Sequence, residues 1–274
     1  MTKLNFKLNR RSFLATGASA MGMLAAPALA LSGHTHGIDY LEGLAAPGAL
    51  HESVHFVAPS AVHTAYSHVF YVNTACYGSG RQKMWILARN GAGWDLALRD
   101  EDYWQRRETA GDWSFPVSTG ALHRGNPRAG PTPTGIFNID ERSQRHRTGW
   151  GSPGMYKALY IDLHYSGGRV SGVAMHGTNQ SRYGALGQPV SHGCVRVTQP
   201  NMDAVWSILH PNGAVREASP LWAEVPRYFR SSVADSMSAR RNYVRDGSLQ
   251  TDNNGAVLTK MGYSALFVFF SDDY

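Results

Sequence analysis

The amino-acid sequence predicts a mainly β domain, sandwich-like in its arrangement of strands, with one amphipathic helix. Three observations predict this fold class. Short runs rich in aromatic and β-branched residues recur along the chain, turn residues separate these runs, and helical periodicity is sustained in one segment. Several short strands at such spacing are typical of a sandwich or barrel-like domain and disfavour alternating β-α-β units.

The first segment, residues 1–30, is predicted to be a cleaved export signal. It contains four basic residues and no acidic one, a weakly apolar stretch over 13–24, and the small-x-small sequence "ALA" at 28–30. The pair Arg10-Arg11 resembles the twin-arginine signal, which leads folded proteins across a bacterial inner membrane. An uncleaved membrane anchor is the alternative, but glycine, serine and proline dilute the apolar stretch. We expect a periplasmic protein that meets the membrane only during export.

The charge balance excludes a nucleic-acid-binding protein. The chain has 26 Lys and Arg residues against 20 Asp and Glu residues, and removal of the signal leaves 22 against 20. About 240 residues remain, which is enough for one domain with a sizeable core. The sequence contains no CxxC, HExxH, P-loop or GxGxxG pattern, so it predicts neither a metal site nor a cofactor.

Residues 31–65 are rich in Gly, Ala, His and Pro without a sustained period, and we interpret them as a linker or irregular arm. The apolar runs 68–77 and 83–88 flank "GSGRQ" and predict a hairpin. The runs 113–120 and 135–140 are also strand-like.

A second hairpin is predicted where the runs 158–165 and 169–177 flank Gly167-Gly168. Residues 218–274 are interpreted as a C-terminal extension. Residues 219–247 are polar with scattered aromatic residues and are interpreted as a surface segment or a weak helix. The apolar run 264–270 is too short to span a membrane and is expected to pack as an extra strand.

The predicted helix follows residue 198. Its apolar face is formed at i, i+3, i+4 and i+7 by Met202, Val205, Trp206 and Leu209. Thr198 is the expected N-cap, with Pro200 in the first turn, and the sequence "HPNG" at 210–213 ends the helix.

The segment between the second hairpin and the helix contains the candidate chemistry. His176 ends a strand, and 14 residues separate it from the cluster Ser191-His192-Gly193-Cys194. A thiol attacks a carbonyl only as thiolate, so Cys194 needs a base, which His176 would supply across the loop. The Gly177 carbonyl is a candidate to orient the imidazole ring. A buried, inert cysteine beside structural histidines is the alternative that residue types alone leave open.

Two further features favour catalysis over that alternative. Gly193 and Cys194 offer consecutive backbone N–H groups of the kind that form an oxyanion hole. Arg196 is placed to pair with a substrate carboxylate, although a simple surface position is the alternative. His192 is closer to Cys194 in the chain than His176, but with only Gly193 between them its ring can hardly fold back onto the sulfur. We therefore expect His176 to transfer the proton and His192 to shape the pocket.

The pattern "HGT…SHGCVR" resembles the active-site signature of the L,D-transpeptidase (YkuD-type) family. Upstream, "FPVSTG" and "PTPTGIF" resemble that family's paired Gly-containing turns, and downstream "NGAVRE" resembles its closing segment, so the resemblance covers residues 66–217. It implies a mainly β catalytic domain that acts on peptidoglycan stem peptides. It also implies roles for eight residues: catalytic ones for Cys194, His176, His192 and Gly193, and substrate binding for Arg196, Ser191, Gly177 and Thr178.

The resemblance implies a transpeptidase that forms a thioester on Cys194, releases D-alanine from a tetrapeptide stem and passes the acyl group to an amine. The amine belongs to a neighbouring stem or to a wall-attached lipoprotein. An L,D-carboxypeptidase or cell-wall amidase with the same Cys and His is the first alternative, and a non-catalytic wall-binding protein is the second. The charged insertion 91–112 and the lack of a recognisable peptidoglycan-binding module depart from the family pattern.

The two cysteines, Cys76 and Cys194, are predicted not to form a disulfide, although an oxidising compartment permits one. A disulfide would consume the nucleophile. Cys76 lies in a run with a strand pattern, where a buried thiol is expected.

Overall fold

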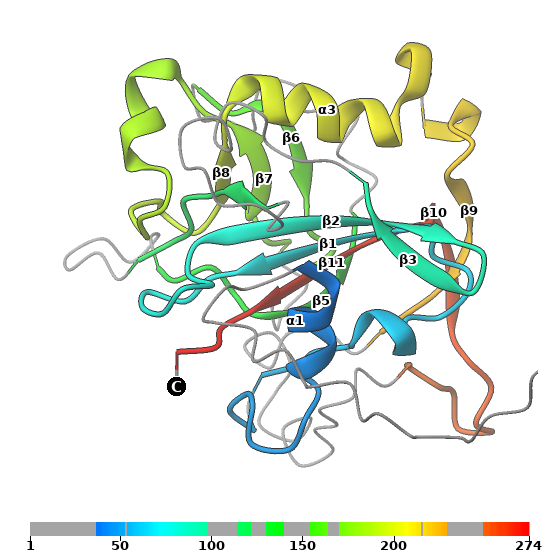
Figure 1. The fold of residues 1–274 in the computed structure, drawn as a ribbon. Helices are drawn as coiled ribbons and strands as arrows, with labels where there is room; N and C mark the ends of the chain where they lie inside the picture. Colours follow the sequence, from blue (N-terminus) through cyan, green and yellow to red (C-terminus); the bar gives the residue numbers. More distant parts are fainter. Residues whose placement is uncertain are drawn as a thin grey trace, which may run out of the picture. The chain divides into compact units, whose positions relative to one another are not determined.

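A mixed β-sheet with the strand order β3-β2-β1-β11-β5 is the largest element of the fold (Figure 1). Its central pair, β1 and β11, runs parallel, and the other neighbouring strands run antiparallel. A short strand, β4, pairs with β2 beside this path. The strands are β1 (His68–Asn73), β2 (Lys83–Asn90), β3 (Gly93–Leu96), β4 (Phe115–Pro116), β5 (Gly135–Asn138) and β11 (Ala265–Phe270).

This computed structural model describes residues 37–52, 54–97, 114–121, 130–139, 154–163, 170–214, 216–228 and 249–273. All of them belong to one unit of the chain, Gly33–Tyr274. The predicted export signal, residues 1–30, and most of the insertion 91–112 lie outside the described residues. The part of the insertion that is described forms β3 against β2.

Two smaller sheets complete the fold. The first has the order β6-β7-β8, with β6 and β7 antiparallel and β7 and β8 parallel. The second is the antiparallel pair β9 and β10. Their strands are β6 (Tyr156–Tyr160), β7 (Ala174–Gly177), β8 (Val195–Val197), β9 (Trp222–Pro226) and β10 (Thr259–Tyr263). The helices are α1 (Gly37–Gly43), α3 (Gln199–Leu209) and the short 3-10 turns η1 (Pro59–Ala61), η3 (Gln180–Ala185), η4 (Pro211–Gly213) and η5 (Arg216–Ala218).

The predicted fold class is confirmed, because the regular secondary structure of the described residues is mainly β-strand, arranged in sheets, with few helices. The two predicted hairpins correspond to the β1–β2 and β6–β7 pairs. The predicted helix is α3, whose N-cap Thr198 accepts a hydrogen bond from the Asn201 N–H at 3.2 Å.

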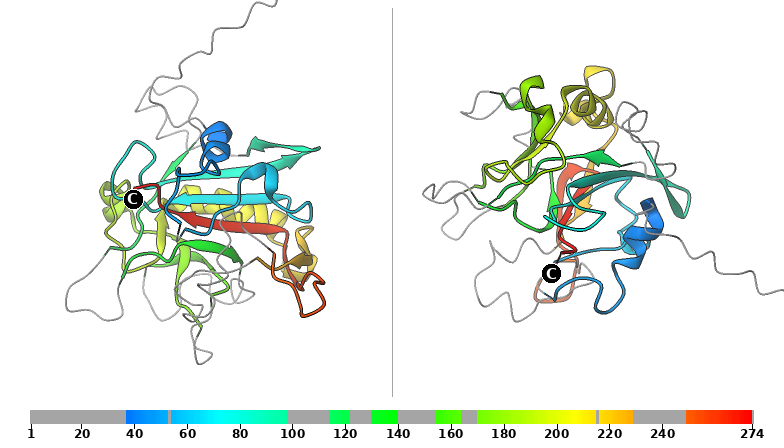
Figure 2. Two further views of the ribbon diagram at one scale, coloured as in Figure 1. Left: turned by 90° about the horizontal axis from the view of Figure 1, so that it is seen from below. Right: turned by 60° about the vertical axis from the view of Figure 1, so that its left-hand side comes forward.

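The large sheet is buried on both faces. Along β1, Phe70 and Val72 belong to one apolar cluster, and Val69 and Tyr71 belong to another on the opposite face. This double burial explains why β1 and β11 are apolar almost throughout instead of alternating with polar residues. Figures 1 and 2 show α3 on one side of this sheet and α1 on the other.

The first cluster lies between the large sheet, the β6-β7-β8 sheet and α3. Phe267 and Phe269 of β11 contribute to it from one side, and Met175 and Val195 from the other. The apolar face predicted for α3 packs here as well, since Met202, Val205, Trp206 and Leu209 all belong to this cluster. The sheet that carries the cysteine motif is therefore held by apolar burial against the large sheet.

The second cluster shows that residues 31–65 differ from the predicted linker or irregular arm. Within the described part, Leu41 of α1 and the apolar residues from Val54 to Val62 cover the other face of the large sheet. Phe56 packs on Tyr71 and Phe270 with ring centroids 5.7 and 5.3 Å apart. Because this segment follows an irregular path, its buried residues show no helix or strand period in the sequence.

Residues 218–274, predicted to be an extension, also contribute to the sheets. The run 264–270 forms β11, which lies between β1 and β5 and is buried along its whole length. An extra strand was expected there, but a central one was not. The sequence boundary at 217 therefore does not correspond to a structural boundary.

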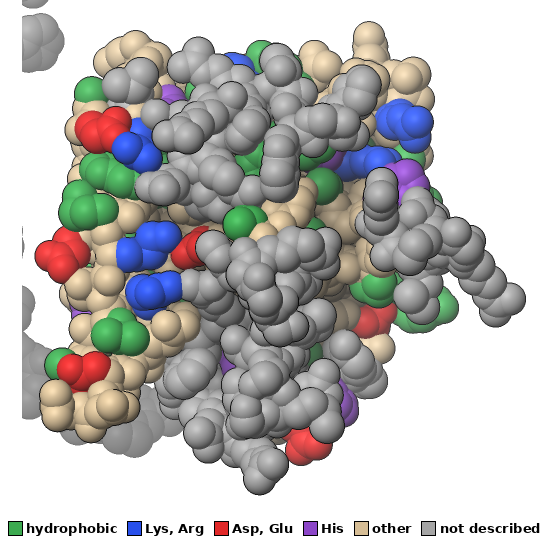
Figure 3. Space-filling view, turned by 180° about the vertical axis from the view of Figure 1, so that it is seen from behind, with side chains coloured by type: hydrophobic (Ala, Val, Ile, Leu, Met, Phe, Trp, Pro, Cys, Tyr) green, Lys and Arg blue, Asp and Glu red, His purple; other side chains and the backbone are tan. Residues whose placement is uncertain are grey.

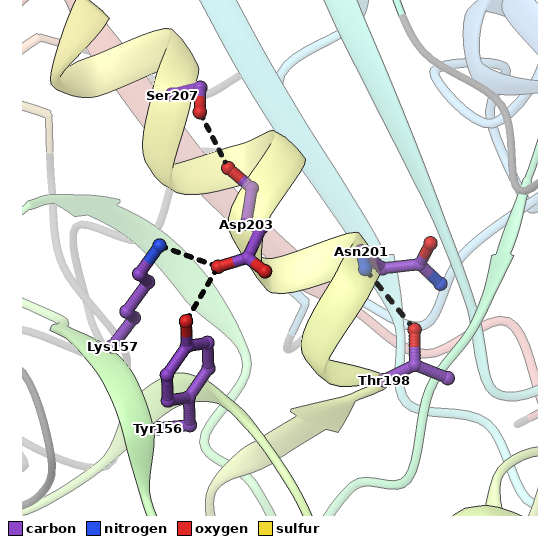
Figure 4. A network of polar contacts seen from close by, with 6 residues as sticks. All are labelled: Tyr156, Lys157, Thr198, Asn201, Asp203 and Ser207. Atoms are coloured by element: carbon purple, nitrogen blue, oxygen red, sulfur yellow. Dashed lines mark hydrogen bonds and ion pairs between the residues drawn. The ribbon is translucent and has the colours of Figure 1, made fainter. Parts of the chain in front are cut away.

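Polar contacts join α3 to β6 at the end of the small sheet (Figure 4). Asp203 on α3 accepts hydrogen bonds from the hydroxyl of Tyr156 at 2.8 Å and from the ammonium of Lys157 at 2.5 Å. The ring of Tyr156 lies over Gly177, where a Cβ atom would come within 3.0 Å of Cδ1 of the ring. These contacts set the position of the strand end that follows His176.

Charged side chains of both signs lie beside one another on the face that Figure 3 shows. One pair with a buried member is Lys260 on β10 with Asp162, at 2.8 Å. None of the described helices is both long enough and apolar enough to cross a membrane.

We expect Phe267→Ala in β11 to destabilise the whole fold, because this fully buried ring belongs to the cluster shared by the two sheets. Truncation of a buried Phe costs about 3–5 kcal/mol of unfolding free energy. Met261→Ala on β10 is the control, since Met261 is 52% exposed and should change stability by about 0.5 kcal/mol or less. Urea denaturation followed by tryptophan fluorescence measures both. Equal small effects would contradict the central position of β11.

Candidate active site

The register of two parallel strands brings His176, Arg196 and Cys194 together. Met175 pairs with Val195, and His176 pairs with Arg196. Cys194 directly precedes this ladder, so it lies beside Ala174 at the same level of the sheet. Residues 176 and 194, which are 18 positions apart in the sequence, thus become neighbours on adjacent strands.

These three side chains share one face of the sheet. Successive side chains of a strand point to opposite faces, and Met175, Val195 and Val197 enter the core cluster. His176, Cys194 and Arg196 alternate with them and therefore point away from that core. The packing of the apolar residues thus determines which face carries the polar ones, since a slip of one residue would reverse both sets.

The imidazole of His176 is buried and held through one nitrogen. Its Nδ1 is 3.0 Å from the carbonyl oxygen of Gly177. A carbonyl only accepts hydrogen bonds, so Nδ1 carries the proton and Nε2 is the basic nitrogen. Burial lowers the pKa of His176 to about 4, the Gly177 hydrogen bond opposes this, and the charge of Arg196 lowers the pKa further. The ring is consequently neutral at physiological pH.

The thiol of Cys194 is half-buried and donates to the carbonyl oxygen of Gly172, with 3.7 Å between sulfur and oxygen. Burial raises the pKa of Cys194, while a hydrogen bond from the backbone of Ala174 and the charge of Arg196 lower it. Burial has the largest effect, so the thiol is protonated at rest. His176 and Cys194 together form a neutral base and a neutral acid, not a thiolate–imidazolium pair.

The loop before Cys194 is organised by the hydroxyl of Ser191. Its Oγ donates to the Cys194 carbonyl at 2.5 Å and accepts from the Gly193 N–H at 3.1 Å. The first of the two backbone N–H groups predicted for an oxyanion hole is therefore used within the loop. The backbone of Gly193 has φ near +130°, a conformation that favours glycine.

The guanidinium of Arg196 is half-buried beside Cys194. Burial lowers the pKa of Arg196, the nearby charge of Arg182 lowers it further, and Cys194 raises it. Arg182 belongs to η3, the turn that connects β7 to the cysteine loop. The charge of Arg196 acts on the thiol of Cys194, and the charge of Arg182 acts on Arg196, so this side of the site carries positive charge.

The other predicted site residues have distinct positions. Gly177 contributes the carbonyl that orients His176. Thr178 is buried and continues the ladder, donating its N–H to the Val197 carbonyl at 2.9 Å. The side chain of His192 is exposed, in contrast to the buried ring of His176.

Sequence patterns did not identify the residues that hold the loop 191–194 through hydrogen bonds to its backbone and to the strand that follows it. Gln82 is fully buried and bonds Thr119: its Nε2 donates to Thr119 Oγ1 at 2.8 Å, and its Oε1 accepts from the Thr119 N–H at 2.8 Å and from Oγ1 at 3.1 Å. The Ser118 backbone pairs with Arg196 through two hydrogen bonds of 2.9 Å, and Thr132 bonds the Gly193 carbonyl at 2.8 Å. The turns "FPVSTG" and "PTPTG" contain three of these residues, but their resemblance to known turns did not indicate a bonding role.

Both cysteines are free in the structure, Cys76 exposed and Cys194 half-buried. The exposure of Cys76 differs from the buried thiol that was expected from its strand-like run. β1 ends at Asn73, so Cys76 lies in the following turn, where its N–H bonds the Asp273 carboxylate. Within the described ranges, no three His, Cys, Asp or Glu side chains are grouped closely enough to hold a metal ion.

Comparison with known protein families identifies one match. The model of the YkuD family, described as the L,D-transpeptidase catalytic domain, matches residues 97–216. The matched segment includes His176, Cys194 and Arg196, and it ends shortly after α3. No curated protein matches the chain.

Several solved structures are similar over about half of the chain. An L,D-transpeptidase from Mycobacterium tuberculosis H37Rv is 18% identical, with a TM-score of 0.31, and the match covers 50% of this chain and 51% of that one. An L,D-transpeptidase from Mycobacterium smegmatis is 18% identical with a TM-score of 0.28, and covers 52% and 53%. Bdellovibrio bacteriovorus Bd1075 is 17% identical with a TM-score of 0.33, and covers 58% and 49%. The chain thus spans about half the length of each of these proteins.

The protonation states predict how Cys194 reacts with an alkylating agent. In a Cys76→Ser variant, Cys194 is the one thiol in the sequence. Its pKa is raised, so the thiolate fraction is small at neutral pH and grows only as the pH rises past the ordinary thiol value of about 8.5. Alkylation by iodoacetamide, followed by intact mass spectrometry across pH, should show this late rise. A titration midpoint below neutrality would instead demonstrate a thiolate–imidazolium pair.

Proposed function

We propose that this protein is a peptidoglycan L,D-transpeptidase that transfers an acyl group through a thioester on Cys194. The observation that carries this proposal is the β7–β8 register, which puts a neutral imidazole, a thiol and a guanidinium on one face of a sheet. This arrangement lies within the segment that matches the L,D-transpeptidase catalytic domain. Acyl transfer by a cysteine requires a base, a nucleophile and a site for the developing oxyanion.

In the first step, Sγ of Cys194 attacks the carbonyl carbon of the third residue of a tetrapeptide stem. Nε2 of His176 takes the thiol proton as the S–C bond forms, since Nδ1 is occupied by Gly177. The carbonyl oxygen becomes an oxyanion that accepts from the Cys194 N–H. Because the resting pair is neutral, proton transfer accompanies attack rather than preceding it.

In the second step, the tetrahedral intermediate collapses and the C–N bond to the terminal D-alanine breaks. The protonated His176 donates to the departing amine. The same burial that gives His176 its pKa of about 4 makes its imidazolium a strong acid, which suits this donation. D-Alanine leaves with the proton, and the tripeptide acyl group remains on Cys194 as a thioester.

In the third step, an amine replaces the thiolate. His176 removes a proton from the incoming amine, the amine nitrogen attacks the thioester carbonyl, and Cys194 leaves and recovers a proton. An amine on a neighbouring stem yields an L,D cross-link, and an amine on a wall-attached lipoprotein yields an anchored protein. Water in place of the amine would make the same site an L,D-carboxypeptidase.

The charge around Cys194 supports an anionic substrate. Stem peptides carry carboxylates near the scissile bond, and the guanidinium of Arg196 presents donors that pair with a carboxylate through two parallel hydrogen bonds. Peptidoglycan is assembled outside the inner membrane, so this function agrees with the export that the twin-arginine-like segment predicts.

The products of a stem peptide distinguish the transpeptidase from its alternatives. We expect the mature protein to convert a purified disaccharide-tetrapeptide into cross-linked dimers and free D-alanine, with Cys194→Ala inactive. Mass spectrometry identifies the products. Tripeptide without dimers would assign carboxypeptidase activity, and unchanged substrate would leave a wall-binding role as the better account.

The two imidazoles should differ in their effect on acylation. His176→Ala removes the general base, and such a loss typically lowers the rate by about a hundredfold to ten-thousandfold. His192→Ala removes an exposed ring, so we expect a smaller loss, mainly in turnover. The rate of Cys194 acylation by a carbapenem, followed by intact mass, measures both variants. A larger effect from His192→Ala would reverse the two roles.

A further inference from the structure

The hydroxyl of Thr132 connects the two turns that flank the nucleophile. Its Oγ1 accepts from the Gly120 N–H at 2.8 Å and donates to the Gly193 carbonyl at 2.8 Å. The side chain is 4% exposed, so water competes little for these bonds. One buried hydroxyl thus joins the segment 114–121 to the residue before Cys194.

The Gly193 carbonyl belongs to the same peptide unit as the Cys194 N–H. This peptide is trans, so its C=O and N–H point in opposite directions. A hydrogen bond that holds the carbonyl toward Thr132 therefore directs the N–H of Cys194 away from Thr132. The carbonyl on the other side of Cys194 is held by Ser191 Oγ.

We propose that Thr132 is a positioning residue that orients the oxyanion donor of the site. This inference rests on the proposed acyl-transfer function of Cys194. The Gly193 N–H is used by Ser191, so the Cys194 N–H is the donor left from the pair predicted for the oxyanion hole. The direction of this one N–H is thus critical for stabilising the tetrahedral intermediate, and Thr132 determines it.

The close approach of two glycines supports this role. A Cβ atom on Gly120 would lie 2.2 Å from the Gly130 carbonyl oxygen and 2.8 Å from the Gly193 nitrogen. The absence of side chains lets the backbones come near enough for one threonine to span them. Thr119, the neighbour of Gly120, is held by the buried amide of Gln82. Gly120, which donates its N–H to Thr132, thus follows a residue that Gln82 holds in place, and Thr132 links this fixed segment to the Gly193 carbonyl.

The test compares two reactions of the same thiol in the Cys76→Ser background. With p-nitrophenyl acetate, Sγ forms a bond to the acetyl carbon and the carbonyl oxygen becomes an oxyanion. The C–O bond to the leaving group then breaks and nitrophenolate departs. With iodoacetamide, sulfur displaces iodide at a saturated carbon and no oxyanion forms. An oriented N–H donor accelerates only the first reaction.

Thr132→Val keeps the volume of the side chain and removes both hydrogen bonds. We expect acylation to fall by about tenfold to a hundredfold, less than the ~10²–10³ lost when an oxyanion donor is removed outright. Alkylation should change by less than about twofold. Thr132→Ser keeps the hydroxyl and should restore most of the acylation rate. Thr132→Ala gives the same comparison if the valine variant does not fold.

Ser219 provides a matched control far from the cysteine loop in the sequence. Its buried hydroxyl also joins a carbonyl and an N–H, those of Leu209 at 2.6 Å and Leu221 at 3.2 Å. Ser219→Ala should lower the melting temperature, as Thr132→Val does, and leave the ratio of acylation to alkylation unchanged. This variant separates a general loss of stability from a loss of the oriented donor.

The outcomes distinguish this inference from the proposed function. Two results would overturn the role of Thr132. The first is an unchanged ratio of acylation to alkylation in Thr132→Val, and the second is a wild-type thiol that the ester does not acylate. A reduced ratio in a protein that leaves the tetrapeptide intact would support the role of Thr132 and reject the substrate. Cross-linking by wild type together with a reduced ratio supports both.

Discussion

The parallel pairing of β7 with β8 is the interaction on which the site depends. Antiparallel neighbours can be joined by a tight turn, but parallel neighbours require a connection that travels back along the sheet. The chain meets this need with η3 and the loop that ends at Ser191, so both the turn with Arg182 and the cysteine loop are consequences of one pairing. The core residues Met175 and Val195 fix its register, and this register in turn determines which side chains stand beside Cys194.

Burial shifts the pKa values of the two reactive groups, His176 and Cys194, in opposite directions, with the same result for their charge. Burial lowers the pKa of His176 and raises that of Cys194, so both effects favour the uncharged forms. The charge of Arg196 and the hydrogen bond from the Ala174 backbone lower the pKa of the thiol, which makes it easier for His176 to remove the proton. A resting site without a thiolate is also protected from oxidation and adventitious alkylation, which require the anionic sulfur. Under the proposed function, the thiolate would form only when a substrate carbonyl lies beside Cys194.

Features that depend on local patterns could be predicted from the sequence, whereas those that depend on distant partners could not. The β1–β2 turn and the apolar face of α3 repeat with the periods of their elements, and the cap at Thr198 uses a residue type with a known preference. The burial of Phe56 follows from an irregular chain path that has no period in the sequence. The position of β11 follows from its pairing with β1, which is distant in the sequence. In the site, the motif indicated His176 and Cys194, but the roles of Thr132 and Gln82 arise from backbone partners, and residue type does not reveal those.

The placement of β11 has a consequence for how the chain reaches its folded state. Partners such as His68 and Ala265 are about 200 residues apart, so the central pair of the large sheet closes a very long loop. During synthesis, one edge of β1 has no partner until β11 has been made, and an unpaired apolar edge can pair with other chains. This edge of β1 is therefore expected to stay unpaired in the nascent chain until residues 265–270 have left the ribosome. We therefore expect the large sheet to close only after β11 has been synthesised, because a fragment that ends before residue 265 leaves β1 without its parallel partner.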